Sequence, residues 1–204
     1  MKILVAYYSL YGHMLEMAHA VAEGAREVSG MDVRLRRIQE FDVVEKAIDG
    51  NEYLSQVRDK QSHIPVCTLD DLREADGMLF GSPTRFGNMT AQMKQLFDSA
   101  GSVWLKGELE GKPAGVFTST ASTHGGQETT LLSMMIPLIH LGAIIVGIPY
   151  SYEGMIHTDA RGGTPYGAST IAGPRGELKP HVEDFKLARM QGHRVAMITS
   201  KLRG

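Results

Sequence analysis

The 204-residue sequence predicts an α/β protein built on one doubly wound parallel sheet. Short apolar runs alternate with longer stretches of helical periodicity, which is the pattern of consecutive β–α–β units. Neither a linker nor an internal repeat divides the chain, so we expect a single domain over residues 1–204. The five predicted strands are Lys2–Tyr8, Met31–Ile38, Asp76–Gly81, Lys112–Ser119 and Ala143–Ile148.

Helical spacing of apolar residues predicts the intervening helices. Thr68 is a plausible N-cap for the second of them, and Gly101 is expected to end the third. Pro137 interrupts the apolar pattern of the fourth. The predicted helices are Met14–Ser29, Leu69–Ala75, Met89–Ser99, Glu128–Leu141 and Glu183–Leu202.

Two segments do not fit the alternation of strand and helix. Residues 39–68 are predicted to be a surface insertion, with a short helix over Phe41–Leu54 that Gly50–Asn51 breaks. Residues 149–180 are rich in glycine and proline and have little periodicity. Because they are too long for a plain connection, we expect this segment to be functional or interfacial.

The bulk composition excludes several classes of function. A formal net charge of −2 disfavours a nucleic-acid surface, which needs clustered lysine and arginine. The single cysteine, Cys67, excludes an internal disulfide and multi-cysteine zinc sites, and the histidines show no metal-binding spacing. The apolar runs are too short to span a membrane, and the chain starts as a strand without a signal peptide, so we expect a cytoplasmic protein.

Three polar loops follow predicted strands and are expected to meet at one edge of the sheet. They are Ser9–Met14, Ser82–Asn88 and Ser119–Gly126. In open parallel sheets, ligands bind outside the carboxyl ends of the strands. Three such loops in the expected places therefore predict one ligand site there.

The first loop has the composition of an anion site. It lies between a strand and a helix, whose N-terminal N–H groups and dipole attract negative charge. It has neither the lysine of a phosphate-binding P-loop nor the spacing of a dinucleotide fold. A single phosphomonoester held by backbone N–H groups, Ser9 and His13 fits this loop, although an ordinary βα turn has a similar composition.

The other two loops have residues suited to a planar polar ring. Arg85 and Phe86 offer a cation and an aromatic surface, and the third loop offers hydroxyls and backbone amides. A structural turn would explain each loop equally well. Trp104 is either packing or the wall of a pocket. His140 is either a helix C-terminal cap or a proton donor near neutral pH.

Four stretches, at these loops and in the later glycine-rich segment, carry long motifs: Tyr7–His13, Gly81–Met89, Gly125–Glu128 and Arg161–Ala168. They resemble the WrbA family of flavodoxin-like NAD(P)H:quinone oxidoreductases. The resemblance runs from Lys2 to the final helix, including both extra segments.

The resemblance implies a flavodoxin-like fold with strand order 2-1-3-4-5, non-covalent FMN and a homo-oligomer, either a dimer or a tetramer. Trp104 would bind the substrate, while His140 and Tyr11 would be catalytic, His140 approaching the flavin in its own or a neighbouring subunit. The third loop departs from the glycine-richer family pattern at Ala121–His124. The implied cofactor residues are Ser9, Leu10, Tyr11, Gly12, His13, Met14, Thr84, Arg85, Phe86, Ser119, Thr120, Ala121, Ser122, Thr123, His124, Gly125 and His140.

The implied reaction is two-electron reduction of quinones by NADH or NADPH, with ping-pong hydride transfer through FMN. Two alternatives remain open at this point. An electron-carrier flavodoxin would be smaller and more acidic, for steering toward protein partners. An FMN-dependent azo or nitroaromatic reductase would have a similar fold. A role beside nucleic-acid regulators lacks support, because the sequence shows no basic stripe or helix-turn-helix.

Overall fold

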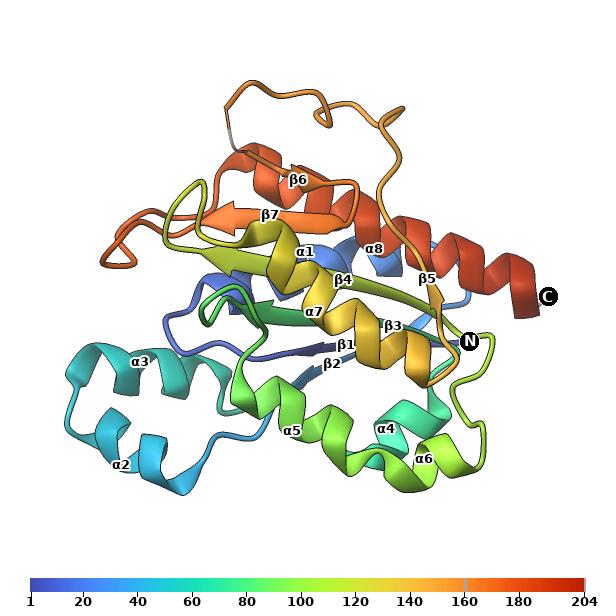
Figure 1. The fold of residues 1–204 in the computed structure, drawn as a ribbon, viewed down its shortest axis with the longest axis horizontal. Coiled ribbons are helices and arrows are strands. Elements are labelled where there is room, and N and C mark those ends of the chain that lie inside the picture. Colours follow the sequence, from blue (N-terminus) through green and yellow to red (C-terminus); the bar gives the residue numbers. More distant parts are fainter. Residues whose placement is uncertain (160, 204) are drawn as a thin grey trace.

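A computed structural model describes residues 1–159 and 161–203, and a central sheet with helices on both faces dominates it (Figure 1). Within the described residues seven strands form one sheet in the order β2-β1-β3-β4-β7-β6, with β5 paired to β4 off that path. The strands are β1 (Lys2–Tyr7), β2 (Asp32–Arg37), β3 (Gly77–Pro83), β4 (Pro113–Thr120), β5 (Ile144–Ile145), β6 (Gly163–Thr164) and β7 (Gly167–Ile171).

Two hydrophobic cores lie on opposite faces of the sheet, because successive side chains of a strand point to opposite sides. On β1, Ile3 and Val5 enter the core under α1 and α8, whereas Leu4 and Ala6 enter the core under α4, α5 and α7. The helices are α1 (His13–Arg26), α2 (Asp42–Asp49), α3 (Glu52–Gln61), α4 (Leu69–Glu74), α5 (Ala91–Ser99), α6 (Gly101–Leu105), α7 (Gln127–His140) and α8 (Val182–Arg203).

The predicted doubly wound sheet is confirmed, but its fifth position is divided between two short strands. Of the predicted strand Ala143–Ile148, only Ile144–Ile145 pairs with β4, at its first two residues. The chain then leaves the sheet and returns as β7, which pairs with Thr118–Thr120 at the other end of β4. The segment 149–180, expected to be irregular, thus supplies the strand that completes the sheet beside the predicted site.

The predicted break at Gly50–Asn51 in the insertion at residues 39–68 is confirmed, since α2 ends at Asp49 and α3 begins at Glu52. Asn51 caps α3 by accepting a hydrogen bond from the Leu54 N–H at 3.1 Å. Helix α3 extends beyond the predicted end at Leu54, to Gln61. The cap at Thr68 is confirmed and forms a capping box with Asp71. Gly101 was predicted to end a helix, but instead it begins one, because helix α6 starts at this residue.

Close packing of α1 against α8 depends on two glycines. A Cβ on Gly192 would lie 1.9 Å from the carbonyl oxygen of Val21, and one on Gly24 would lie 1.8 Å from that of Arg189. Each helix therefore presents bare backbone to the other. A side chain of any size would force the two helices apart.

Replacing Gly192 by alanine is expected to lower the free energy of unfolding by about 2 kcal/mol, because the added methyl overpacks the α1–α8 contact. Urea denaturation of the purified variant measures this. Gly101→Ala is the matched control: its methyl enters open space at a helix start, so stability should change by no more than about 0.5 kcal/mol. Equal stabilities of the two variants would contradict the packing argument.

Candidate functional site

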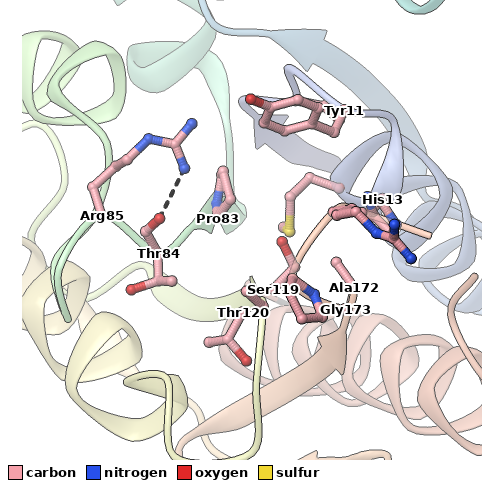
Figure 2. Close-up of a pocket in the computed structure, with 15 residues that line it drawn as sticks. Tyr11, His13, Pro83, Thr84, Arg85, Ser119, Thr120, Ala172 and Gly173 are labelled. Atoms are coloured by element: carbon pink, nitrogen blue, oxygen red, sulfur yellow. Dashed lines mark hydrogen bonds between the residues drawn. The ribbon is translucent and has the colours of Figure 1, made fainter. Parts of the chain in front are cut away.

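A cleft of about 240 Å³ opens at the carboxyl ends of β1, β3 and β4, where the three polar loops meet (Figure 2). A fourth segment, residues 172–176 after β7, closes its remaining side. The lining residues are Ser9, Tyr11, His13, Met14, Pro83, Thr84, Arg85, Ser119, Thr120, Ala121, Ala172, Gly173, Pro174, Arg175 and Gly176.

The first loop leaves the N-terminus of α1 open toward the cleft. Gly12 is the N-cap residue with φ of +96°, a left-handed conformation that favours glycine, and its lack of a side chain leaves the helix without a side-chain cap. Its own N–H donates to the Ser9 Oγ at 3.2 Å. The N–H groups of the first helical turn have no carbonyl within the helix to bond. An anion bound here would accept hydrogen bonds from them.

His13 serves chiefly as a link between α1 and the segment after β7. Its ring Nε2 lies 2.8 Å from the carbonyl oxygen of Leu178, and the side chain is buried at the cleft wall. The Leu178 N–H in turn donates to Ala172 at 2.9 Å, and the Ala172 N–H donates to Thr120 at 2.7 Å. The ring nitrogen predicted to face a phosphate is therefore committed to a backbone carbonyl.

Thr84 organises the second loop. Its N–H donates to the Ser119 carbonyl at 2.8 Å, and its Oγ1 accepts from the Gly87 N–H at 3.1 Å and from Thr130 Oγ1 at 2.8 Å. Arg85 lines the cleft beside it, and its guanidinium donates to the Thr84 carbonyl at 2.8 Å. Phe86 differs from expectation: with φ of +54° its side chain is fully exposed at the turn and does not line the cleft.

The third loop contributes only its first half to the cleft. Ser119, Thr120 and Ala121 line it, and Thr120 Oγ1 donates to the Ser122 carbonyl at 2.9 Å, which starts the turn. The second half leaves the cleft toward solvent, so four predicted contacts lie outside its lining: Ser122, Thr123, His124 and Gly125. Leu10 also faces elsewhere, toward a second hollow beneath α2 and α3.

The charges around the cleft suit an anion with polar groups. Among the lining residues that the structure describes there are two arginines, Arg85 and Arg175, and no carboxylate. Positive potential from the α1 N-terminus adds to theirs. Tyr11 stands at the mouth with 48% of its side chain exposed, on the side of the cleft opposite Thr120 (Figure 2).

A buried polar cluster supports the end of β1 below the loops. Tyr8 donates to the Glu40 carboxylate, and Gln92 Nε2 donates to Tyr8 at 3.2 Å and to Glu40 at 2.5 Å. Burial, followed by the bond to Glu40, raises the pKa of Tyr8 well above its usual value. This phenol therefore stays protonated at neutral pH and acts as a fixed donor in the scaffold.

Two predicted site residues lie far from the cleft of their own chain. His140 is the last residue of α7, and that 14-residue helix leads away from the third loop over about 20 Å. Trp104 lies on α6, at the same remote end of the sheet (Figure 1), with 60% of its side chain exposed. A single chain cannot bring either side chain to the cleft without unfolding its helix.

The sequence did not predict that residues 172–176, Arg175 among them, would line the site. Only the glycine and proline content of segment 149–180 hinted at function, and no spacing rule connects these residues to β1 or β4. In residues 1–159 and 161–203, no helix is long and apolar enough to cross a membrane, and no cluster of three or more metal-ligating side chains occurs.

Comparison with known proteins is consistent across sequence and structure. Residues 1–157 match the family described as NADPH-dependent FMN reductase. Proteins named NAD(P)H dehydrogenase (quinone) are similar over almost the whole chain: 51% identity in Geotalea uraniireducens, covering 99% of each chain, and 50% in Geobacter sulfurreducens, covering 100% of each. The crystal structure of a WrbA-like flavodoxin from Agrobacterium tumefaciens aligns with a TM-score of 0.65 at 25% identity, covering 98% of each chain.

Replacing His13 by alanine is expected to release the segment that closes the cleft, because its bond to the Leu178 carbonyl is lost. Amide hydrogen exchange of residues 173–178 should then accelerate by about tenfold or more, while β7 stays protected. His19→Ala is the control, since His19 lies on the same helix but lines the groove toward α8. Unchanged exchange in residues 173–178 would show that His13 does not hold this segment.

Proposed function

The chain belongs to the NADPH-dependent FMN reductase family, as a WrbA-type NAD(P)H dehydrogenase (quinone), and on that premise we propose that its cleft binds FMN for the reduction of quinones. The observation that carries the proposal is the convergence of an uncapped helix N-terminus, hydroxyl-bearing loops and two arginines on one carboxylate-free cleft. The expected absence of bound metal is part of the same proposal.

The residues of the cleft fit FMN from one end to the other. The loop Ser9–Met14 and the first turn of α1 would hold the phosphate, with Ser9 and the backbone N–H groups as donors. Thr84, Ser119 and Thr120 would bond the ribityl chain and the polar edge of the ring system. Arg85 would offset negative charge that develops on the reduced ring. Because Phe86 and Ser122–Gly125 lie outside the cleft lining, we assign them no contact with FMN within one chain.

When bound, FMN would supply two-electron chemistry: it can take up a hydride from NADH or NADPH and pass the two electrons to a quinone. The protein's part would be to leave one face of the flavin ring open at the mouth of the cleft, so that the nicotinamide and the quinone could occupy it in turn. Tyr11 stands at this mouth, where its side chain would contact the nicotinamide and its hydroxyl would donate to the quinone oxygen as that atom gains negative charge. Alternating use of one face of the flavin ring by the two substrates would produce ping-pong kinetics.

The remote positions of His140 and Trp104 lead us to propose that they act at the cleft of a second copy in a homo-oligomer, either a dimer or a tetramer. On α7, Leu132, Ile136 and Ile139 form an exposed apolar stripe, with 59% of Ile136 in contact with solvent. Residues at this spacing share one helix face. A stripe of this kind that ends at His140 is typical of an interface between subunits.

The cytoplasmic location predicted from the sequence belongs to the same proposal. Cys67, the only cysteine, is a buried free thiol, and burial raises its pKa to about 12. A thiol that is unpaired and uncharged is consistent with a reducing compartment, where NADH and NADPH are consumed.

The purified protein is expected to bind FMN, lose its visible flavin absorption on addition of NADH and regain it on addition of benzoquinone. Initial rates at several concentrations of both substrates should give parallel double-reciprocal lines. Converging lines would contradict the alternating use of one site. A protein that takes up no FMN would overturn the proposed function altogether.

The purified protein also distinguishes quinone reduction from the two alternative functions, electron transfer to protein partners and reduction of azo or nitroaromatic compounds. A reductive titration that halts at the one-electron stage would favour an electron carrier. Faster turnover of azo or nitroaromatic acceptors than of quinones would favour the reductase of those compounds. We expect complete two-electron reduction and a preference for quinones.

Replacing Ile136 by glutamate is expected to dissociate the oligomer, because a charge in the centre of an apolar interface is costly to desolvate. Size-exclusion chromatography with light scattering should show a smaller species than the wild type. Val43→Glu is the matched control, an exposed aliphatic residue on α2, and should leave the mass unchanged. A wild type that is already monomeric would contradict the proposed assembly.

A further inference from the structure

We propose that the inserted helix α3 positions the loop Ser9–Met14, here called the phosphate loop. Gln61 and Tyr53 of α3 set the direction of the peptide groups in this loop. This inference rests on the proposed binding of FMN. It concerns the segment 39–68, whose two helices otherwise have no assigned role. In Figure 1, α2 and α3 lie at the same end of the molecule as the loop that follows β1.

One stripe of α3 contacts the loop along its outer side. Tyr53, Val57 and Gln61 recur at intervals of four residues and therefore lie on one face of the helix. Tyr53 OH donates to the Tyr11 carbonyl at 2.9 Å, and Gln61 Nε2 donates to the Ser9 carbonyl at 2.9 Å. Val57 fills the space between them, since its methyl groups lie 3.8 Å from a Cβ built on Gly12.

Gln61 is itself held in a fixed orientation. Its side chain is buried, and its Oε1 accepts a hydrogen bond from Tyr7 OH at 3.2 Å. The amide of Gln61 is thereby oriented with its NH₂ group toward Ser9. Burial raises the pKa of Tyr7 well above its usual value, so this phenol remains a donor over the whole working range of pH.

The hydrogen bonds from Gln61 and Tyr53 each fix the orientation of one whole peptide group, both its carbonyl and its N–H. In a trans peptide the C=O and the following N–H point in opposite directions, and the described peptide bonds are trans. Holding the Ser9 carbonyl on α3 turns the Leu10 N–H away from α3, and holding the Tyr11 carbonyl does the same for the Gly12 N–H. The Gly12 N–H accordingly donates to the Ser9 Oγ at 3.2 Å and fixes that hydroxyl, whose own proton is left to donate.

The consequence for a bound phosphate is electrostatic. Two carbonyl oxygens that would repel it are bonded to α3, and the Leu10 N–H and the Ser9 hydroxyl, which would attract it, are preorganised. Without α3 the loop would have to adopt this arrangement at the moment of binding, at an entropic cost. Gln61 and Tyr53 are therefore positioning residues, which act on the ligand only through the backbone of the loop.

The test compares FMN with riboflavin, which has the same ring and ribityl chain but no phosphate. Titration of flavin-free protein, followed by quenching of flavin fluorescence, gives both dissociation constants. In Gln61→Leu we expect FMN binding to weaken by about tenfold and riboflavin binding to change by less than about twofold, because one buried hydrogen bond is lost at the phosphate end. Tyr53→Phe should weaken FMN binding by about threefold, again with riboflavin little changed.

Gln56→Leu is the matched control, because Gln56 lies on the exposed face of α3 and its side chain donates to the Glu52 carboxylate at 3.3 Å. It should bind both flavins as the wild type does. If Gln61→Leu fails to fold, Tyr53→Phe still tests the positioning role, since it removes only one hydroxyl from a half-exposed ring. An unchanged ratio of FMN to riboflavin affinity in a wild type that binds FMN would overturn the positioning role alone. A wild type without FMN binding would overturn the proposed function as well.

Discussion

Parallel pairing of β1, β3 and β4 is the constraint on which the rest of the molecule depends. Parallel strands end at one edge, so three loops distant in sequence must converge there. The strands are buried on both faces, and their register is fixed because a one-residue shift would exchange the two cores. Ser9, Thr84 and Ser119 meet at the cleft as a consequence of this pairing.

The two insertions complete what the sheet begins. Segment 149–180 returns to the sheet as β7, continues through residues 172–176 along the cleft and is linked to α1 by His13. Helix α3 contacts the loop Ser9–Met14 on its opposite side through Gln61. This loop therefore lies between the segment that follows β7 and the inserted helix α3. Their contacts are mostly to backbone carbonyls, which hold a loop in place whatever its side chains are.

The cleft of one chain is open at its mouth. Tyr11 stands there alone, while His140 and Trp104 lie at the other end of the sheet. An exposed apolar stripe on α7 leads to His140. We therefore propose that one chain binds the cofactor, and that contacts to the substrate need a second copy.

The amino-acid sequence determined the alternation of strands and helices, the cap at Thr68 and the three loops at one edge, because periodicity and turn chemistry are local properties. It also carried the family motifs that imply FMN and quinones. Only the tertiary structure decided that Phe86 and Ser122–Gly125 lie outside the cleft lining, that His13 bonds the Leu178 carbonyl and that residues 172–176 line the cleft. Those outcomes depend on pairings between distant segments, above all the division of the fifth sheet position between β5 and β7, for which no local pattern exists.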